Sequence, residues 1–425
     1  MKYQAPRGVK DLLPPDSETF RRLEDEVREV FGRSGFREIR LPLFESADLF
    51  ARSIGESTDI VEKEMYLFSG KGGESLALRP EGTASLIRAA IEHRLAEPGR
   101  LERLFYQGPM FRHERPQAGR LRQFHQAGAE ILGSSDPDDD VDLIATVSRH
   151  ALESKIPASR LLINSMGCPE CRPAYREILV GYLEKNLDTL CETCRRRTHA
   201  NPLRVLDCKI PSCQPVLESA PHLADFLCPA SRNHFERVCR GLEGEGIAFT
   251  VSHRLVRGLD YYTETAFEWV SDALGAQSTW AAGGRYNGLV RHLGGGDVPG
   301  VGLAIGIERL FLLRELAGTL PKASRPAVHL AVHPLEEAAK PYAHRILASL
   351  REQGISAVGI FGQARLKKAF LQAEREGASF IGLLGGDELS TGTITIKHLA
   401  SGIQKSLPIF PPDRMADAIR EPWVP

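Results

Sequence analysis

The sequence predicts an α+β protein of several domains, in which a mostly helical segment interrupts the first domain and an α/β domain follows it. A chain of 425 residues is too long for one hydrophobic core, so two or three domains are expected. The cysteines gather between residues 166 and 240, where apolar residues follow mainly helical spacing. Beyond residue 326, strand-like apolar runs alternate with helical stretches, which is typical of an α/β sheet.

Residues 18–34 predict the first helix, which Gly35 ends. Residues 35–45 then indicate a strand that Pro42 interrupts, and proline is tolerated only at an edge or an end of a sheet. The apolar positions that define the helix are Phe20, Leu23, Val27, Val30 and Phe31.

Charge and composition narrow the function classes. The formal net charge of -1 excludes a globally basic surface, so nucleic acid would have to bind at local arginine clusters. No apolar run approaches the roughly 20 residues needed to cross a bilayer, and the N-terminal residues lack the apolar segment of a signal peptide. We therefore expect a cytoplasmic protein with no membrane partner.

A domain boundary is predicted at residues 321–326, where two prolines, a serine and two charged residues separate apolar segments. The following residues, 327–425, predict an α/β domain with a mixed sheet, because strand and helix patterns alternate along them.

The densest group of polar side chains is the run RGLDYYT at residues 257–263. It places an arginine, a carboxylate, two phenols and a hydroxyl around Gly258, whereas a strand with one buried face alternates apolar and polar residues. This density indicates a site that holds a flat, polar ligand.

Residues 105–133 predict two strands joined by a turn at Gly119. Arginines alternate there with aromatic residues, a combination that suits ATP because guanidinium groups bind phosphate oxygens and aromatic rings stack on adenine. A solvated basic hairpin is the alternative interpretation. The charged residues of this segment are Arg112, His113, Glu114, Arg115, Arg120 and Arg122, and the aromatic ones are Phe105, Phe111 and Phe124.

Two further segments are weak indications of a ligand site when taken alone, but the arginine-bearing hairpin supports that interpretation of both. Residues 300–316 predict an apolar strand that ends at a glycine, followed by a helix that begins with Glu308 and Arg309, where the arginine can reach phosphate. A βα turn with a surface arginine is the alternative. Residues 78–85 (LRPEGTAS) fit a ligand site and a capped helix N-terminus equally well.

Together these segments resemble class II aminoacyl-tRNA synthetases, and RGLDYYT resembles the signature peptide of the histidyl-tRNA synthetases. The first helix and strand resemble motif 1, which builds a dimer interface. Residues 105–133 resemble motif 2, and residues 300–316 resemble motif 3. The resemblance covers essentially the whole chain. It implies a class II antiparallel sheet flanked by helices (residues 1–165 and 241–320), a cysteine-rich helical insertion (166–240) and an anticodon-binding α/β domain (327–425), in a homodimer.

The resemblance implies a histidine-tRNA ligase, which activates histidine with ATP and Mg²⁺ and transfers it to tRNA(His). Arg112 and Arg257 are the implied catalytic residues, on opposite sides of the α-phosphate, and Glu130 and Tyr262 are the candidates for the imidazole ring. The implied histidine ligands are Glu81, Thr83, Gln126, Glu130, Arg257, Tyr261, Tyr262 and Tyr286; the implied ATP ligands are Arg112, Glu114, Arg120, Phe124 and Arg309; Arg115 and Gln117 are assigned to the acceptor end of tRNA.

Two other functions compete with the ligase. One is a synthetase-like regulatory subunit of ATP phosphoribosyltransferase, which lacks the anticodon-binding domain and loses catalytic arginines, whereas this chain keeps both. The other is an RNA-binding sensor, which would require loss of the ATP contacts. In the C-terminal domain, Arg365, Lys367 and Lys368 are the candidates for contact with RNA.

Six cysteines form three closely spaced pairs, which in a cytosolic chain indicates metal binding rather than disulfides. The residues between the first two pairs predict a helix of about 19 residues, roughly 28 Å long, so those pairs could not share one ion. The better set of ligands for a structural Zn²⁺ is therefore Cys191, Cys194, Cys208 and Cys213.

The remaining pair, Cys168 and Cys171, would need further ligands, of which Cys228 is the candidate. Ser231 stands where a further cysteine would complete this second group, so the group is incomplete. Cys239 has apolar neighbours at helical spacing and is expected in the core. Reduced thiols without metal are the alternative for the whole insertion.

Overall fold

The computed structural model describes residues 3–55, 58–117, 119–321, 328–362, 365–409, 413–420 and 423. The chain divides into two compact units, Met1–Pro321 and Lys322–Pro425, and each is described by itself. Most of the predicted linker, residues 322–326, lies outside the described residues.

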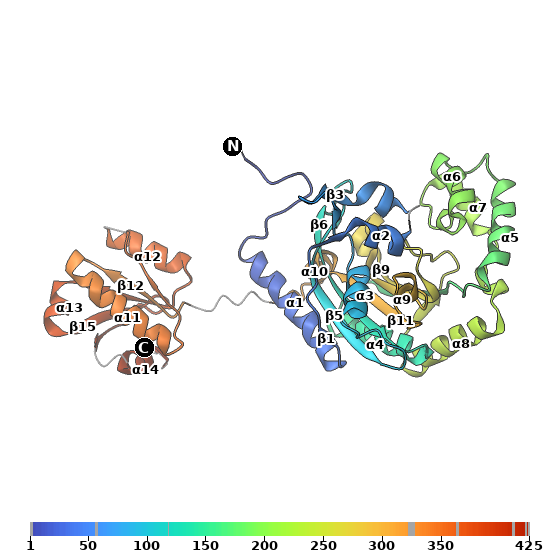
Figure 1. Ribbon diagram of the computed structural model, residues 1–425. Helices are drawn as coiled ribbons and strands as arrows, with labels where there is room; N and C mark the ends of the chain where they lie inside the picture. Colours follow the sequence, from blue (N-terminus) through green and yellow to red (C-terminus); the bar gives the residue numbers. More distant parts are fainter. Residues whose placement is uncertain are drawn as a thin grey trace. The chain divides into compact units, whose positions relative to one another are not determined.

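Among the described residues of the first unit, a large sheet forms the centre (Figure 1). It has eight strands in the order β1-β5-β6-β11-β10-β9-β7-β8. Neighbouring strands are antiparallel except at the two edges, where β1 runs parallel to β5 and β8 runs parallel to β7. The expected antiparallel sheet flanked by helices is thereby confirmed. The strands are β1 (Arg37–Glu38), β5 (Glu102–Phe111), β6 (Gln123–Leu132), β7 (Ser159–Ser165), β8 (Phe249–Val251), β9 (Thr263–Ser271), β10 (Thr279–Arg285) and β11 (Gly300–Gly306).

The predicted first helix is confirmed, and the strand pattern that follows it is interrupted at Pro42, as predicted. Helix α1 spans Asp16–Arg33 and buries the side chains of Phe20, Leu23, Val27 and Phe31. Residues on either side of Pro42 join different sheets, since β1 lies at the edge of the large sheet and β2 (Phe44–Ser46) pairs with β4 (Ser75–Leu78) in a small sheet that also contains β3 (Tyr66–Ser69). Proline lacks the N–H that would continue a ladder, which explains the break.

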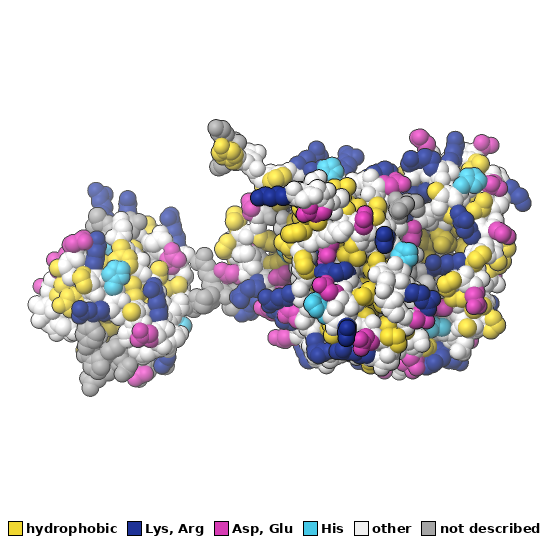
Figure 2. Space-filling view, viewed as in Figure 1, with side chains coloured by type: hydrophobic (Ala, Val, Ile, Leu, Met, Phe, Trp, Pro, Cys, Tyr) yellow, Lys and Arg dark blue, Asp and Glu magenta, His cyan; other side chains and the backbone are white. Residues whose placement is uncertain are grey.

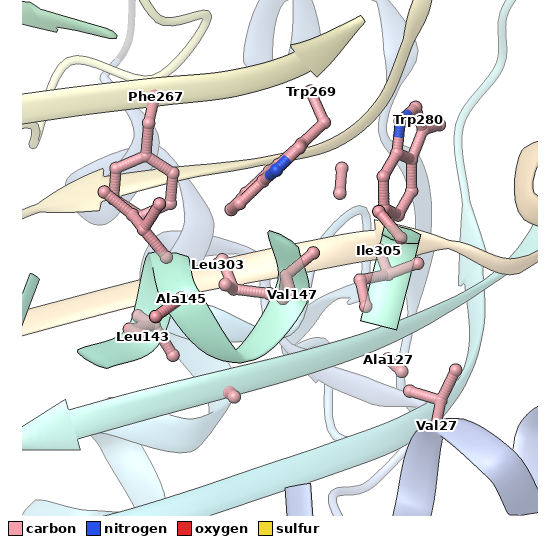
Figure 3. Close-up of a cluster of buried hydrophobic side chains, with 14 of the residues drawn as sticks. Val27, Ala127, Leu143, Ala145, Val147, Phe267, Trp269, Trp280, Leu303 and Ile305 are labelled. Carbon is pink, nitrogen blue, oxygen red and sulfur yellow. The ribbon is translucent and has the colours of Figure 1, made fainter. Parts of the chain in front are cut away.

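The main core lies between one face of the large sheet and the helices α1 and α4 (Pro137–Glu153), as Figure 3 shows for side chains from both layers. Two indoles dominate it: Trp269 on β9 and Trp280 on β10 have ring centroids 6.1 Å apart and donate to Ser148 and Ser159. Alternate residues of a strand point to opposite faces. Glu268, next to Trp269, therefore points away from this core, toward the face that carries the site described below.

Helices outside the main core complete the first unit. Within the described residues no helix is both long and apolar enough to cross a membrane. Figure 2 shows Lys and Arg side chains interspersed with Asp and Glu on the visible face of this unit. The remaining helices of the unit, apart from short single turns, are α2 (Ala47–Ile54), α3 (Thr83–Glu92), α5 (Arg172–Glu184), α6 (Glu192–Ala200), α7 (Gln214–Glu218), α8 (Pro229–Gly244), α9 (Leu289–His292) and α10 (Ile307–Leu316).

The insertion is mostly helical, as expected, and in Figure 1 its helices α5, α6 and α7 lie together at one side of the large sheet. The helix predicted to run through the residues between Cys171 and Cys191 is wrong in length, because α5 ends at Glu184. There a side chain replaces a backbone donor: the side-chain amide of Asn186 donates to the carbonyl of Tyr182 over 2.8 Å. The residues beyond Asn186 form turns.

The second unit is an α/β domain with a mixed sheet, as predicted. Its described strands follow the order β13-β12-β14-β15-β16. The first three are mutually parallel and the last two add antiparallel ladders. Its strands are β12 (Leu330–Pro334), β13 (Ala357–Gly359), β14 (Phe380–Leu384), β15 (Thr393–His398) and β16 (Gln404–Pro408), and its α-helices are α11 (Lys340–Glu352), α12 (Leu366–Arg375), α13 (Gly386–Thr391) and α14 (Asp413–Arg420).

Candidate active site

The predicted arginine-bearing hairpin is formed by β5 and β6, with Gly119 at a φ of 69° in the turn, a value that favours glycine. Arg112 follows β5 directly, and its Nε donates to the carbonyl of Pro80 over 2.9 Å. Its guanidinium lies over the ring of Phe124, 5.3 Å from the centroid. The buried carboxylate of Glu114 pairs with Arg120 and lies 3.9 Å from Arg112. The hairpin thus holds two arginines beside an aromatic ring.

A third arginine reaches the same place from the junction of β11 and α10. Arg309 donates from Nε to the carbonyl of Gly119 over 2.9 Å, and from Nη1 to the carbonyl of Thr279. Burial and the positive charges of Arg120 and Arg112 lower the pKa of Arg309 to about 10. Three guanidinium groups that repel one another in this way create a positive potential that suits phosphate oxygens.

The fourth arginine of the site, Arg257, comes from the RGLDYYT run. Its Nη1 donates to the carboxylate of Glu268, whose other oxygen accepts from the hydroxyl of Thr279 over 2.9 Å. The guanidinium lies over the ring of Tyr262, 5.4 Å from the centroid. Burial acts to lower the pKa of Arg257, but Glu268 and the tyrosines Tyr262 and Tyr261 raise it, so the side chain stays cationic.

These groups line one cavity of about 300 Å³, at the lower end of the usual size of small-molecule sites. Gln126 points a buried Oε1 there that has no hydrogen-bond partner among the described residues, and an unpartnered acceptor favours a ligand with N–H donors. The predicted residues that line the cavity are Arg112, Glu114, Arg120, Phe124, Gln126, Arg257 and Arg309.

A cluster of buried polar groups, which would form the walls of a polar pocket, adjoins the arginines, because Tyr262 lies under the guanidinium of Arg257 and Tyr261 contacts both Tyr262 and Tyr286. The carboxyl group of Glu130, which is 0% exposed, accepts from the hydroxyl of Thr83 over 2.7 Å and from the phenol of Tyr286. Gly302 on β11 is the ladder partner of Glu130, and a Cβ at Gly302 would lie 1.4 Å from Glu130 Oε2. Only glycine therefore leaves room for this carboxyl group.

Burial dominates the electrostatics of this pocket. It raises the pKa of Glu130 to about 8, against the lowering effect of the hydrogen bonds from Thr83 and Tyr286. Burial also raises the pKa of Tyr261 and of Tyr262, whose rings are tilted toward each other with centroids 4.6 Å apart. At neutral pH the pocket therefore offers a protonated carboxyl group and phenols, which both donate and accept hydrogen bonds.

Residues 78–85, which fitted a ligand site and a capped helix N-terminus equally well, provide both. Both carboxylate oxygens of Glu81 accept backbone N–H groups at the start of α3, from Thr83 over 2.7 Å and from Ala84 over 2.8 Å. The Thr83 hydroxyl meanwhile belongs to the Glu130 pocket. The helix N-terminus thus fixes one wall of that pocket.

The two residues assigned to tRNA lie elsewhere. Arg115 and Gln117 are exposed on the hairpin loop and do not line the cavity. Sequence reasoning missed Glu268, which orients Arg257. A signal existed, because Glu268 is a lone carboxylate between Phe267 and Trp269 in an otherwise apolar stretch of strand.

The insertion brings its cysteines into two separate groups. The thiols of Cys191, Cys194, Cys208 and Cys213 lie within 4.8 Å of one another, and three of these residues are buried. Backbone N–H groups point at the sulfurs, as from Cys191 to Cys213 Sγ over 3.2 Å. The second group contains the three thiols of Cys168, Cys171 and Cys228. Cys239 belongs to neither group and packs against the main core, as expected.

The family model described as histidyl-tRNA synthetase matches residues 8–310. The chain belongs to the histidyl-tRNA synthetase family. Residues 329–419 match the model of an anticodon binding domain. The chain is 48% identical over 399 residues to the histidine–tRNA ligase of Trichlorobacter lovleyi and covers 94% of it. It is 45% identical over 405 residues to that of Geobacter sulfurreducens and covers 97% of it.

Solved structures of synthetases agree with the fold. The apo histidyl-tRNA synthetase of S. aureus superposes with a TM-score of 0.80 at 35% identity, covering 99% of this chain and 100% of that one. The cavity and its adjoining pocket bring together most of the residues that the resemblance assigned to histidine and ATP in a synthetase. Their individual roles stay predictions.

Proposed function

We propose that the protein is a histidine–tRNA ligase, which activates L-histidine with ATP to histidyl-adenylate and transfers the histidyl group to the 3′ end of tRNA(His), releasing AMP and pyrophosphate. The observation that carries this proposal is the junction of an arginine-lined cavity with a buried pocket of carboxyl and phenol groups. The first suits ATP phosphates, and the second suits an imidazole ring.

In adenylate formation the carboxylate of histidine attacks the α-phosphorus of ATP and pyrophosphate leaves in line. Negative charge builds on the phosphoryl oxygens, and Arg112 and Arg257 are positioned to neutralise it. Arg120 and Arg309 bind the leaving phosphates, while Phe124 stacks on adenine. The tRNA terminal ribose then attacks the adenylate, which requires no covalent enzyme intermediate.

Selection of histidine follows from the buried pocket. An imidazole ring carries one donor and one acceptor, and the protonated Glu130 with the phenols of Tyr262 and Tyr286 supplies partners of both kinds. An amino acid of similar size without those groups would leave buried polar atoms unpaired, which costs binding free energy. Gln126 accepts a hydrogen bond from the α-amino group of histidine, and Glu81 and Thr83 contact the same group.

Family membership implies the use of Mg²⁺ with ATP. Glu114 and Glu268 line the cavity and offer the carboxylate oxygens that Mg²⁺ prefers, so they are the residues that would hold the ion. When bound, Mg²⁺ neutralises charge on the departing pyrophosphate.

We propose that the active protein is a homodimer located in the cytoplasm, where its tRNA substrate is used. The small sheet carries exposed apolar side chains that a partner subunit would cover, and Phe44 and Phe68 touch there with ring centroids 5.8 Å apart. The exposed side chains are Leu43, Phe44, Leu67 and Phe68. Arg115 and Gln117, on the exposed hairpin loop, contact the acceptor end of tRNA.

The regulatory-subunit alternative is not favoured. Relatives of 45% to 48% identity that span most of this chain are histidine–tRNA ligases. The arginines and an anticodon binding domain are both present. Exchange of labelled pyrophosphate into ATP tests the choice: the purified protein should exchange with histidine and not with glutamine or phenylalanine. Equal rates with all three amino acids would contradict the imidazole pocket.

The four-cysteine group is proposed as a structural Zn²⁺ site. Four thiolates at this spacing match a closed tetrahedral site, and N–H groups that point at the sulfurs stabilise the thiolate form. The ion would hold α6 to the loops that carry Cys208 and Cys213.

Replacing Cys194 by alanine should remove about one Zn²⁺ per chain from the purified protein, because alanine offers no atom to replace the lost ligand. Elemental analysis after purification without chelator measures this, with Cys239→Ala as the matched control that retains the ion. Loss of no metal, with all thiols of the unmodified protein titrating freely, would contradict the site.

A chain that ends at Pro321 should still form histidyl-adenylate but should charge tRNA at least about tenfold more slowly, because the removed unit supplies phosphate contacts. The first unit is compact and contains the whole cavity. Arg365, Lys367 and Lys368 are exposed in the second unit and are the proposed contacts. Single-turnover charging at two salt concentrations measures the effect. Unchanged charging would exclude an anticodon-reading role for the second unit.

A further inference from the structure

A second group of ligating side chains lies where the insertion meets the catalytic domain. Cys168 and Cys171 precede α5, and Cys228 and Ser231 lie at the start of α8. The Sγ atom of Cys168 is 3.5 Å from that of Cys171 and 3.8 Å from that of Cys228. The Oγ atom of Ser231 is 3.5 Å from the sulfurs of both Cys171 and Cys228.

These four distances match four of the six edges of a tetrahedron around a metal ion, and the three sulfurs all lie within 4.8 Å of one another. A Zn²⁺ ion with Zn–S of about 2.3 Å and Zn–O of about 2.0 Å places its sulfur ligands about 3.8 Å apart and a sulfur and an oxygen about 3.5 Å apart. We propose that Cys168, Cys171, Cys228 and Ser231 form a second Zn²⁺ site, with three thiolates and one hydroxyl. The backbone N–H of Cys228 supports it by donating to Cys171 Sγ over 3.1 Å.

Glu264 orients the serine. The hydroxyl of Ser231 donates to Glu264 Oε1 over 3.0 Å, which turns the oxygen lone pairs toward the three sulfurs. Outer carboxylates that fix a ligand in this way are common at metal sites. Glu264 also has a φ of 49°, unusual for a residue other than glycine, and its N–H donates to the carbonyl of Gly167 over 3.1 Å. This strained residue therefore joins both halves of the site.

One residue connects the site to the histidine pocket. Arg172, next to Cys171 in the chain, donates from Nε to the carbonyl of Met166 over 3.1 Å and from Nη2 to the carbonyl of Tyr262. A metal ion that fixes Cys171 thus fixes the main chain of Tyr262. This consequence for histidine binding depends on the proposed function, whereas the metal site itself does not.

Metal counting on the full-length protein tests the site without any activity measurement. The unmodified protein should hold about two Zn²⁺ per chain, one at each cysteine group. Cys228→Ser should lose one of them, and Cys239→Ser, a change on the same helix, should lose none. Ser231→Cys should keep both and should raise the resistance of the second ion to a chelator, because a thiolate replaces a weak hydroxyl ligand. This variant keeps the test decisive if Cys228→Ser folds poorly.

Spectra and kinetics add two independent readouts. With Co²⁺ in place of Zn²⁺, Ser231→Cys should raise the sulfur-to-metal charge-transfer absorption, since the thiolates at the site increase from three to four. In pyrophosphate exchange, Cys228→Ser should raise KM for histidine and leave kcat and KM for ATP nearly unchanged. A disulfide between Cys168 and Cys171 in protein purified anaerobically, or equal metal contents in Cys228→Ser and Cys239→Ser, would overturn the proposal.

Discussion

Replacing Arg257 by alanine should lower the rate of histidyl-adenylate formation at least about 100-fold, because charge on the α-phosphoryl oxygens would lose one of its two neutralising groups. Histidine and ATP should still bind, since Glu130, Arg112, Arg120 and Arg309 remain. Single-turnover adenylation, with each substrate's dissociation constant measured separately, distinguishes a loss of rate from a loss of binding.

Arg254 offers a matched control for this prediction. It lies three residues before Arg257, and its Nη2 donates to Gln214 Oε1 over 2.8 Å, away from the cavity lining. Arg254→Ala should therefore adenylate normally. Arg257→Lys keeps a charge but loses the planar group that spans Glu268 and the phosphate, so an intermediate rate is expected. A turnover rate in Arg257→Ala equal to that of the unmodified protein would refute the catalytic role.

Replacing Glu130 by glutamine should lower kcat/KM for histidine by about 100-fold or more. An amide group does not offer the imidazole ring the same hydrogen-bond donor and acceptor as a protonated carboxyl group. The same change should stabilise the unliganded protein at alkaline pH. The pKa of Glu130 is raised to about 8 in the folded chain by burial, against 4.5 for the unperturbed group. The folded state therefore binds this proton more tightly than the unfolded state.

The pH dependence of stability follows from that difference. The contribution of Glu130 to the free energy of unfolding is complete below pH 4.5, falls as the pH rises and is lost by about pH 8. Glutamine does not titrate, so Glu130→Gln should unfold at a higher temperature than the unmodified protein at pH 8, by an amount equivalent to a few kcal/mol. Thermal denaturation between pH 5 and pH 9 without ligands measures this. Glu97→Gln, a change at an exposed carboxylate, should have no effect, and an equal shift in both variants would contradict the explanation.

The site was predictable where a local pattern carries the chemistry. Gly119 and the arginines of the hairpin could be placed from the sequence, because a turn joining two strands determines its own geometry. Glu268 was missed: its position as a lone carboxylate between two aromatic residues was a signal, but its role depends on a contact with Arg257, which lies outside β9. The small sheet around Phe44 was missed because β2 pairs with residues 75–78, which are distant in sequence. The end of α5 at Glu184 was missed although its cause is local, since the side-chain amide of Asn186 donates to the carbonyl of Tyr182.

The alternation along β9 limits how this gene can change. Phe267 and Trp269 fill the core on one face of the strand, and Glu268 holds Arg257 on the other. Inserting or deleting one residue would exchange the two faces, so that a carboxylate would enter the core among indoles while an indole blocked the cavity. A change of two residues would preserve the faces. Evolution can therefore vary the composition of β9 more freely than its length, and natural insertions near it should occur in the loops that flank the strand.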